Sequence, residues 1–169
     1  AAGAHARRRP GWRSARPSPA QAGRLALGMR RGPRIAISRK TLVVSAIYGQ
    51  QGNGRDGELL VWRSTDGAAS WQGPATVNDA PRAAREGLHA MGAAPDGTLA
   101  CAWLDLREKG TTVFASISSD GGKTWSRNTL VYRSPSGTVC ECRHLSVCFT
   151  PTGELLVMFR NVLAGNRDM

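Results

Sequence analysis

The sequence predicts an all-β protein of the β-propeller class, built from short antiparallel strands. Its apolar residues occur in short alternating or continuous runs, and none of these runs shows the 3.6-residue period of a helix. One apolar segment occurs three times, with matching positions at Thr41, Thr98 and Glu154, which are separated by 57 and 56 residues. A repeat slightly longer than 50 residues, with about four short strands in each unit, is typical of propeller blades.

The first repeat, at about residues 32–80, contains four expected strands. The second strand is almost continuously apolar, which suits a strand buried on both faces between neighbouring sheets. A glycine-rich loop that contains Asp56 separates this strand from the third, because glycines favour turns over regular strand pairing. The four strands are expected at residues 33–38, 41–48, 58–63 and 74–77.

The second repeat, at about residues 87–133, has the same order of strands, and a third begins at about residue 144. The turn sequences Pro95-Asp96-Gly97 and Pro151-Thr152-Gly153 predict hairpins between the first and second strands of these repeats. The strands of the second repeat are expected at residues 87–94, 98–105, 111–117 and 128–132, and the third repeat at residues 144–169.

Two tight turns that follow the third strands share the pattern Ser-x-Asp-x-Gly-x-Thr-Trp. A complete copy ends at Trp125 and a weaker copy ends at Trp71. In such a turn the Asp carboxylate accepts hydrogen bonds from backbone N–H groups a residue or two ahead, glycine supplies a positive φ, and the Trp ring folds back as an apolar plug. This structural role is predicted for Ser64, Asp66, Trp71, Ser118, Asp120, Gly122 and Trp125.

These turns resemble the Asp-box repeats of the sialidase superfamily, whose members fold as six-bladed propellers. The resemblance covers roughly residues 32–169. It implies a sialidase-type propeller, of which this chain would hold about two and a half blades at roughly 55 residues each. The missing blades of the same propeller would then complete the fold. The resemblance also favours a secreted or periplasmic protein, and it implies no cofactor and no metal.

Two residues match positions that carry chemistry in sialidases. In that family, an Arg at the start of the first blade binds the substrate carboxylate, and an Asp between the second and third strands is the acid/base. Arg34 lies in an Arg-Ile-Ala sequence that resembles the family's Arg-Ile-Pro motif, and Asp56 occupies the loop position. A guanidinium can bind a carboxylate through two hydrogen bonds, and glycoside cleavage needs a proton donor for the leaving oxygen. The alternatives are a solvent-facing strand Arg and an ordinary Asp of a glycine-rich turn.

The resemblance implies a fragment of a sialidase-like glycoside hydrolase that cleaves terminal sialic or related acidic sugars from glycans. We expect the fragment alone to be inactive, because the family's Tyr nucleophile, its Glu partner and two further Arg residues belong to later blades. A non-catalytic propeller that binds a glycan or a protein is the alternative. Further substrate contacts are predicted at Asp105, Arg107 and Arg167, and other polar residues expected at the same rim are Arg85, Glu86, His89, Glu141, His144 and Asn161.

The net charge of +11 is concentrated at the N-terminus. Residues 1–34 contain nine Arg and no acidic residue, whereas residues 35–169 contain 14 basic and 12 acidic residues. The segment 1–31 lacks strand periodicity and is expected to be disordered. A nucleic-acid-binding arm is the alternative, which the scarcity of interleaved aromatic residues disfavours, so nucleic acid is not an expected partner. No run approaches the roughly 20 apolar residues of a membrane span.

The four cysteines do not suggest a disulfide framework. Cys101 and Cys148 lie in apolar runs and are predicted to be small buried hydrophobic residues. Cys140 and Cys142 form a pair, but the chain offers no second ligand pair to complete a zinc site. We therefore expect a loop with packed or incidental thiols at this pair.

Overall fold

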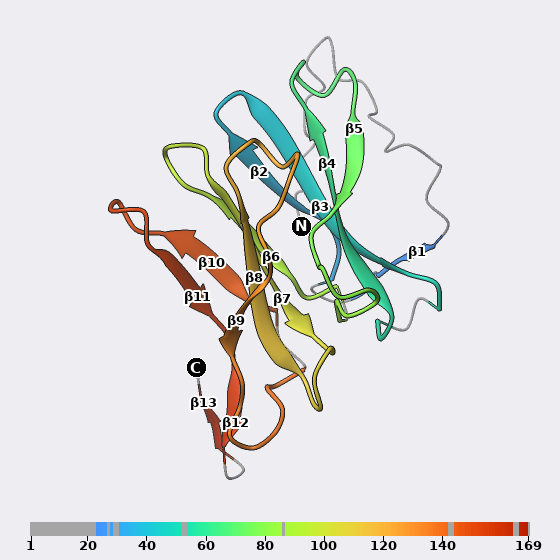
Figure 1. The fold of residues 1–169 in the computed structure, drawn as a ribbon, viewed down its shortest axis with the longest axis vertical. Helices are drawn as coiled ribbons and strands as arrows, with labels where there is room; N and C mark the ends of the chain where they lie inside the picture. Colours follow the sequence, from blue (N-terminus) through green and yellow to red (C-terminus); the bar gives the residue numbers. More distant parts are fainter. Residues whose placement is uncertain are drawn as a thin grey trace, which may run out of the picture.

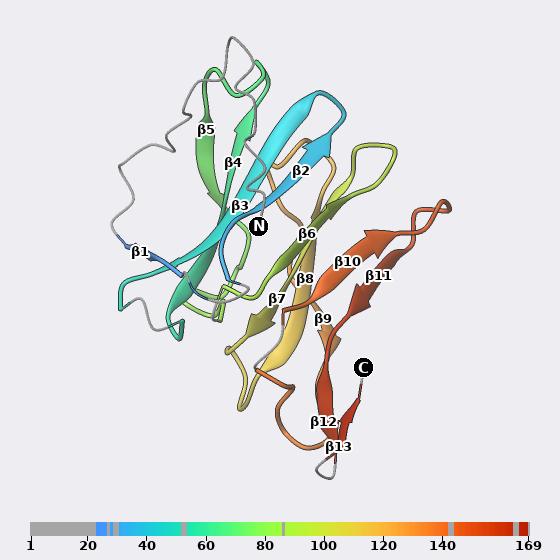
Figure 2. The ribbon, with the colours of Figure 1, turned by 180° about the vertical axis from the view of Figure 1, so that it is seen from behind.

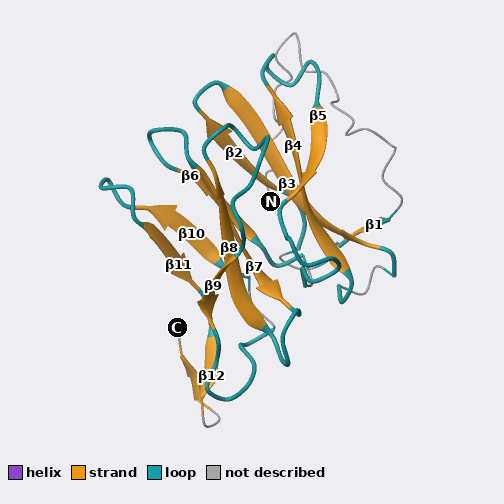
Figure 3. Cartoon of the chain, in the orientation of Figure 1, coloured by secondary structure: helices purple, strands orange, loops and turns teal. Residues whose placement is uncertain are grey.

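A computed structural model describes residues 23–26, 28, 31–51, 54–85, 87–141, 144–163 and 166–168, the side chains of 167 and 168 excepted. This part of the chain consists of antiparallel strands and loops (Figure 1; Figure 3). It contains no helix, and so none that is long and apolar enough to span a membrane. The predicted all-β class is confirmed. The number of blades in a complete propeller and the sialidase type stay predictions.

The first sheet is a meander in which each strand pairs with the next, from β2 to β5. Strand β2 pairs with the first half of β3, from Thr41 to Ser45, and β1 pairs with the last two residues of β3. The strands are β1 (Arg24–Leu25), β2 (Arg34–Ser38), β3 (Thr41–Gly49), β4 (Gly57–Ser64) and β5 (Gln72–Thr76).

The second sheet repeats this meander with β6 (Ala90–Ala93), β7 (Leu99–Asp105), β8 (Thr112–Ser118) and β9 (Thr129–Tyr132). Two hairpins follow, β10 (Ser146–Phe149) with β11 (Leu155–Met158), and β12 (Asn161–Leu163) with β13 (Asn166–Asp168). The first strands of the three repeats, β2, β6 and β10, lie side by side (Figure 2). First strands gathered in this way, with the later strands leading outward, are the arrangement of neighbouring propeller blades.

Strand β1 lies in the segment that was expected to be disordered. Because β2 pairs with β3 only as far as Ser45, the backbone of the last β3 residues is open to another strand, and β1 pairs with it. The Ala26 N–H continues this pairing by donating to Ile47 O at 2.9 Å, and the Ala26 side chain is buried. The expectation of disorder is therefore wrong for residues 24–26, while residues 1–22 lie outside the described part of the chain.

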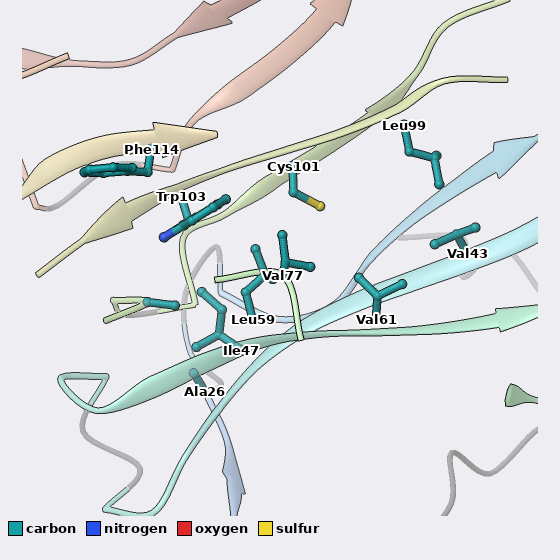
Figure 4. Packing of buried hydrophobic residues seen from close by; sticks show 11 residues of the cluster. Ala26, Val43, Ile47, Leu59, Val61, Val77, Leu99, Cys101, Trp103 and Phe114 are labelled. Atoms are coloured by element: carbon teal, nitrogen blue, oxygen red, sulfur yellow. The ribbon is translucent and has the colours of Figure 1, made fainter. Parts of the chain in front are cut away.

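The main core lies between the first two sheets, where side chains from β3 and β4 meet those from β7 and β8 (Figure 4). Trp103 is completely buried at its centre. A second core, built around Leu104, Val113 and Leu145, joins the second sheet to β10 and β11. The residues of the main core are Ala26, Val43, Ile47, Leu59, Val61, Val77, Ala84, Leu99, Cys101, Trp103 and Phe114.

The third repeat buries only one face. Its β11 residues Leu155 and Val157 pack against the second core, whereas Leu156 and Met158 are exposed. Cys148 lies opposite Leu156 on β10 and is also exposed. The prediction of a buried Cys148 is therefore wrong, because this strand has a neighbouring sheet on one face only among the described residues. Cys101 is buried as predicted.

The complete Asp-centred turn is closed by its own side chains. Ser118 Oγ donates to Asp120 Oδ1 at 2.8 Å and accepts from Gly122 N at 2.9 Å. Asp120 Oδ1 also accepts from the Lys123 and Thr124 N–H groups, both at 3.0 Å. Burial alone would raise the pKa of Asp120, but these hydrogen bonds, together with the one that the Thr124 hydroxyl donates to Oδ2 at 2.6 Å, lower it to about 2. The backbone donors lie three and four residues ahead of Asp120, further than the sequence predicted.

The weaker turn has the same hydrogen bonds. Ser64 Oγ donates to Asp66 Oδ1 at 2.7 Å, and Ser70 N donates to the same oxygen at 2.9 Å. Hydrogen bonds from Ser70 and Ser64 lower the pKa of Asp66 to about 2. Each Trp packs on a core, Trp125 on the main one and Trp71 on a small outer cluster of Ala46, Leu60 and Trp62.

The two turns differ at one backbone position, which gives a paired test. Gly122 has φ 85°, and Ala68 at the matching position has φ 71°, where a side chain is strained. We expect Ala68→Gly to stabilise the protein by about 1 kcal/mol and Gly122→Ala to destabilise it by at least that amount. Urea denaturation of both variants measures the two shifts. Equal effects of the same sign would contradict this explanation.

Candidate functional site

The loops that leave β3 and β7 and the segments that enter β2, β6 and β10 lie along one edge of the sheets, which we call the polar edge. It follows from the meander topology that the two Asp-centred turns, which leave β4 and β8, lie at the opposite edge. The polar edge contains Arg34, Asp56, His89 and Asp105. The predicted site residues of the first two repeats therefore share an edge.

Asp56 is held by the backbone of its own loop. Its Oδ2 accepts from Gln50 N at 2.9 Å and from Gln51 N at 3.0 Å. Its Oδ1 is buried and has no hydrogen-bond partner among the described residues, and it lies so close to Gly49 that a Cβ there would be 2.4 Å away. The carboxylate is thus fixed in position, and only glycine fits beside it at the end of β3.

A pocket of about 100 Å³ opens next to Asp56. Tyr48 provides an aromatic wall, and its ring is packed edge-to-face on Trp62 with the centroids 5.5 Å apart. Carboxylates, an amide and a guanidinium provide the remaining polar surface. The pocket is lined by Tyr48, Gly49, Gln50, Asp56, Glu58, Leu60 and Arg82.

Arg34 lies at another point of the polar edge. It begins β2 opposite Ser45, whereas Asp56 lies beside Gly49, four residues further along β3, or about 13 Å at the rise of an extended strand. Its Nη1 donates to the carbonyl oxygens of the two preceding residues at 3.0 and 3.2 Å. Partial burial lowers the pKa of its guanidinium, which stays charged at neutral pH. The structure therefore does not place Arg34 in the Asp56 pocket.

His89 connects the two sheets near Arg34. Its ring is completely buried, and Nε2 lies 2.8 Å from Ser45 Oγ on β3. Burial, together with the nearby Arg34 charge, lowers the pKa of His89 to about 3. The imidazole is therefore neutral at physiological pH, and with its ring fully covered it serves as a contact between the sheets.

Asp105 and Arg107 form a closed network. Asp105 is fully buried, and its Oδ1 accepts from Arg107 N and Nε at 2.9 and 2.8 Å. Its Oδ2 accepts from Trp103 Nε1 at 2.8 Å. Arg107 continues to Asp79 at 2.6 Å and to Asn128 Oδ1 at 2.8 Å. These polar groups are occupied within the protein, and a contact with substrate stays a prediction.

Two further contacts extend the polar edge towards the third repeat. Arg85 pairs with Glu141 at 2.6 Å, and Glu141 also accepts from Thr111 Oγ1 at 2.6 Å. Asn161 Nδ2 donates to the Tyr132 hydroxyl at 2.9 Å.

The remaining predicted residues lie in or near the third repeat or between repeats. His144 is exposed at the start of the third repeat, and Arg167 lies in β13 with its side chain outside the described part. Glu86 and Cys142 also lie outside it, whereas Cys140 is buried. Groups of three or more potential metal ligands do not occur among the residues that the structure describes.

Backbone hydrogen bonds attach the segment that crosses between the first two sheets to both of them. Gly57 and Ala84 exchange both of their N–H···O=C hydrogen bonds, at 3.1 and 2.9 Å. On the other side of this segment, Arg85 N donates to Leu104 O at 2.8 Å, and Leu106 N donates to Ala83 O at 2.9 Å. A Cβ at Gly57 would lie 2.4 Å from Ala84 O, so the close approach requires glycine.

The sequence did not identify Tyr48, Glu58 or Arg82 as site residues. Tyr48 and Glu58 lie opposite each other in the β3–β4 register and flank the loop of Asp56. Their positions next to this loop could have been predicted from the strand pattern. Arg82 reaches the pocket from the segment between the first two repeats, 24 residues from its partner Glu58. No local pattern in the sequence indicates that contact.

No family model matches the chain, and no curated protein matches it. Among solved structures, the chain is similar to a protein of unknown function from Dyadobacter fermentans, at 16% identity and a TM-score of 0.55, over 86% of this chain and 48% of that one. It is also similar to Penicillium chrysogenum alpha-L-arabinanase complexed with arabinobiose, at 13% identity and a TM-score of 0.49, over 76% of this chain and 38% of that one. The chain thus spans less than half the length of either structure. The first likeness concerns the fold alone.

Proposed function

We propose that this chain is part of a β-propeller that acts on glycans as a sialidase-like glycoside hydrolase, with Asp56 as the acid/base residue. The observation that carries the proposal is the pocket at the end of β3, which Asp56 lines together with Tyr48, Glu58 and Arg82. Aromatic rings can pack on the C–H faces of sugars, and carboxylates accept hydrogen bonds from hydroxyl groups. A small pocket with this lining suits a sugar.

Asp56 would act in two steps. In its protonated form it donates a proton to the glycosidic oxygen as the C–O bond breaks, and as a carboxylate it then activates the attacking water. The Gln50 and Gln51 amides fix the carboxylate, which keeps it oriented for both steps. The resemblance assigns the nucleophile to a Tyr of a later blade.

Terminal sialic or related acidic sugars are the proposed substrates. Their carboxylate needs a cation, and Arg82 lines the pocket that contains Asp56. Guanidinium groups suit this role because they stay charged and present paired donors.

A non-catalytic glycan-binding propeller is the second candidate, and the hydrogen bonds of Asp56 favour it. One oxygen of the carboxylate already accepts two backbone N–H groups, and the other is buried against Gly49. An Asp that only closes its loop would have the same contacts. Binding without turnover is what this candidate predicts.

The test is Asp56→Asn in the full-length protein, with hydrolysis of an aryl sialoside as the readout. We expect the rate to fall by at least about 100-fold, because the proton donor is lost while the shape of the pocket is kept. Asp96→Asn makes the same chemical change in a turn at the opposite edge and should leave the rate unchanged. Full activity of Asp56→Asn would reject the assignment. Calorimetric binding of a sialoside without hydrolysis by the unmodified protein would establish the non-catalytic candidate instead.

A further inference from the structure

We infer that Arg82, rather than Arg34, is the residue that selects an acidic sugar at the Asp56 pocket. Arg82 lines this pocket, whereas Arg34 lies opposite Ser45, away from it. Because Arg82 acts on the pocket to which we assign the glycan, its role rests on the function proposed above. The ligand class is a sugar with a carboxylate, such as a uronic or sialic acid.

The backbone of Arg82 is fixed by its neighbours. Its N–H donates to Glu58 Oε1 at 2.8 Å, and the other oxygen of Glu58 accepts from Asn78 Nδ2 at 2.5 Å. Asn78 is itself attached to β4, because its Oδ1 accepts from Leu59 N at 2.7 Å. Ala84, two residues after Arg82, pairs with the start of β4. The side chain of Arg82 therefore starts from a defined point at the pocket.

The guanidinium of Arg82 has no hydrogen bond or ion pair with any other residue that the structure describes. The two carboxylates of the pocket are occupied by other donors, Glu58 by the Arg82 backbone N–H and Asn78, and Asp56 by the backbone N–H groups of its loop. Arg82 is exposed, so its five N–H groups are available to an incoming ligand.

The conformation of Arg82 supports a role at the pocket. Its φ is 59°, in the left-handed region that residues other than glycine rarely adopt. This conformation is strained for a residue with a side chain, and it persists because the contacts on both sides determine it. Within one pocket, a ligand could present its carboxylate to Arg82 and its glycosidic oxygen to Asp56.

The experiment measures binding of free glucuronate and N-acetylneuraminate, with galactose as the neutral sugar, by titration calorimetry of the full-length protein. Arg82→Gln should weaken the binding of both acids roughly 10- to 100-fold, because charge-assisted hydrogen bonds are lost, and should leave galactose unchanged. Lys123→Gln removes the same charge at the opposite edge and should change neither. Arg34→Gln should have little effect on the acids.

Three results would overturn the inference. These are equal binding of acidic and neutral sugars by the unmodified protein, unchanged binding of the acids by Arg82→Gln, and a larger loss in Arg34→Gln than in Arg82→Gln. Urea midpoints of the variants check that all remain folded. The proposed function is judged separately by Asp56-dependent hydrolysis, so Asp56→Asn can lose turnover while the binding test of Arg82 still succeeds or fails by itself.

Discussion

Replacing Arg107 with Met is expected to lower the free energy of unfolding by about 3–5 kcal/mol. Asp105 is fully buried, and three of its four hydrogen bonds come from Arg107, two of them from the guanidinium. Removal of that side chain leaves a buried carboxylate with too few donors. The loss of the guanidinium packed 4.0 Å from the centre of the Phe114 ring adds to the effect.

The chain offers a matched control for this prediction. Arg133 pairs with Glu108 at 2.6 Å, but more than half of its side chain is exposed, at 58%. Arg133→Met should therefore lower the free energy of unfolding much less than Arg107→Met does, because exposed ion pairs contribute little to stability. Urea denaturation of both variants, together with sugar binding, separates structure from recognition. A small stability loss in Arg107→Met with a large loss of sugar binding would support the substrate role that the sequence predicted.

His89 is expected to make the protein less stable as the pH falls from 7 to 5. The folded state keeps His89 neutral, because burial and then the Arg34 charge lower its pKa to about 3 from an ordinary value of 6.5. The unfolded chain takes up a proton in this range, and the folded chain does not. The contribution of His89 to the free energy of unfolding is therefore fully present above pH 6.5. It decreases as the pH falls through this value, by about 2 kcal/mol between pH 7 and pH 5.

Urea denaturation at several pH values measures this slope. In His89→Gln the slope between pH 7 and 5 should disappear, whatever the stability of the variant at pH 7. Hydrogen bonds lower the pKa values of Asp66 and Asp120 to about 2, so these residues change the stability only below about pH 4. They therefore do not contribute to the slope between pH 7 and 5. An unmodified protein whose stability is flat between pH 7 and 5 would show that His89 can be protonated in the folded state.

The strands were predictable because their signals are local. The repeat spacing and the alternation of apolar residues predicted the order of β2 to β9, with ends displaced by up to three residues, and a third repeat where β10 and β11 lie. Strand β1 was missed, since two residues that pair through their backbone leave no periodic pattern. The exposure of Cys148 was missed for a different reason. The sequence of a strand does not show whether one of its faces lacks a covering sheet.

The candidate site was predictable only in part. Asp56 was identified by its place between two strands, and the structure puts it at a pocket. The convergence of Arg107, Asp79 and Asn128 was not foreseeable, because Asp79 and Asn128 are 49 residues apart and meet only in the folded protein. Arg82 was missed for the same reason. Its partner Glu58 belongs to another element, and no motif joins them.

The backbone pairing of Gly57 with Ala84 means that the residues which hold the crossing segment in place differ from the residue proposed to contact a ligand. The segment that crosses between the sheets is attached on both sides by its main chain, and these attachments do not depend on the identity of side chains at 82 or 85. Substitution of the exposed Arg82 can therefore change what the edge recognises without loosening the crossing, whereas Arg85 is buried and paired with Glu141. Position 57, in contrast, requires glycine, because any side chain there would collide with Ala84 O.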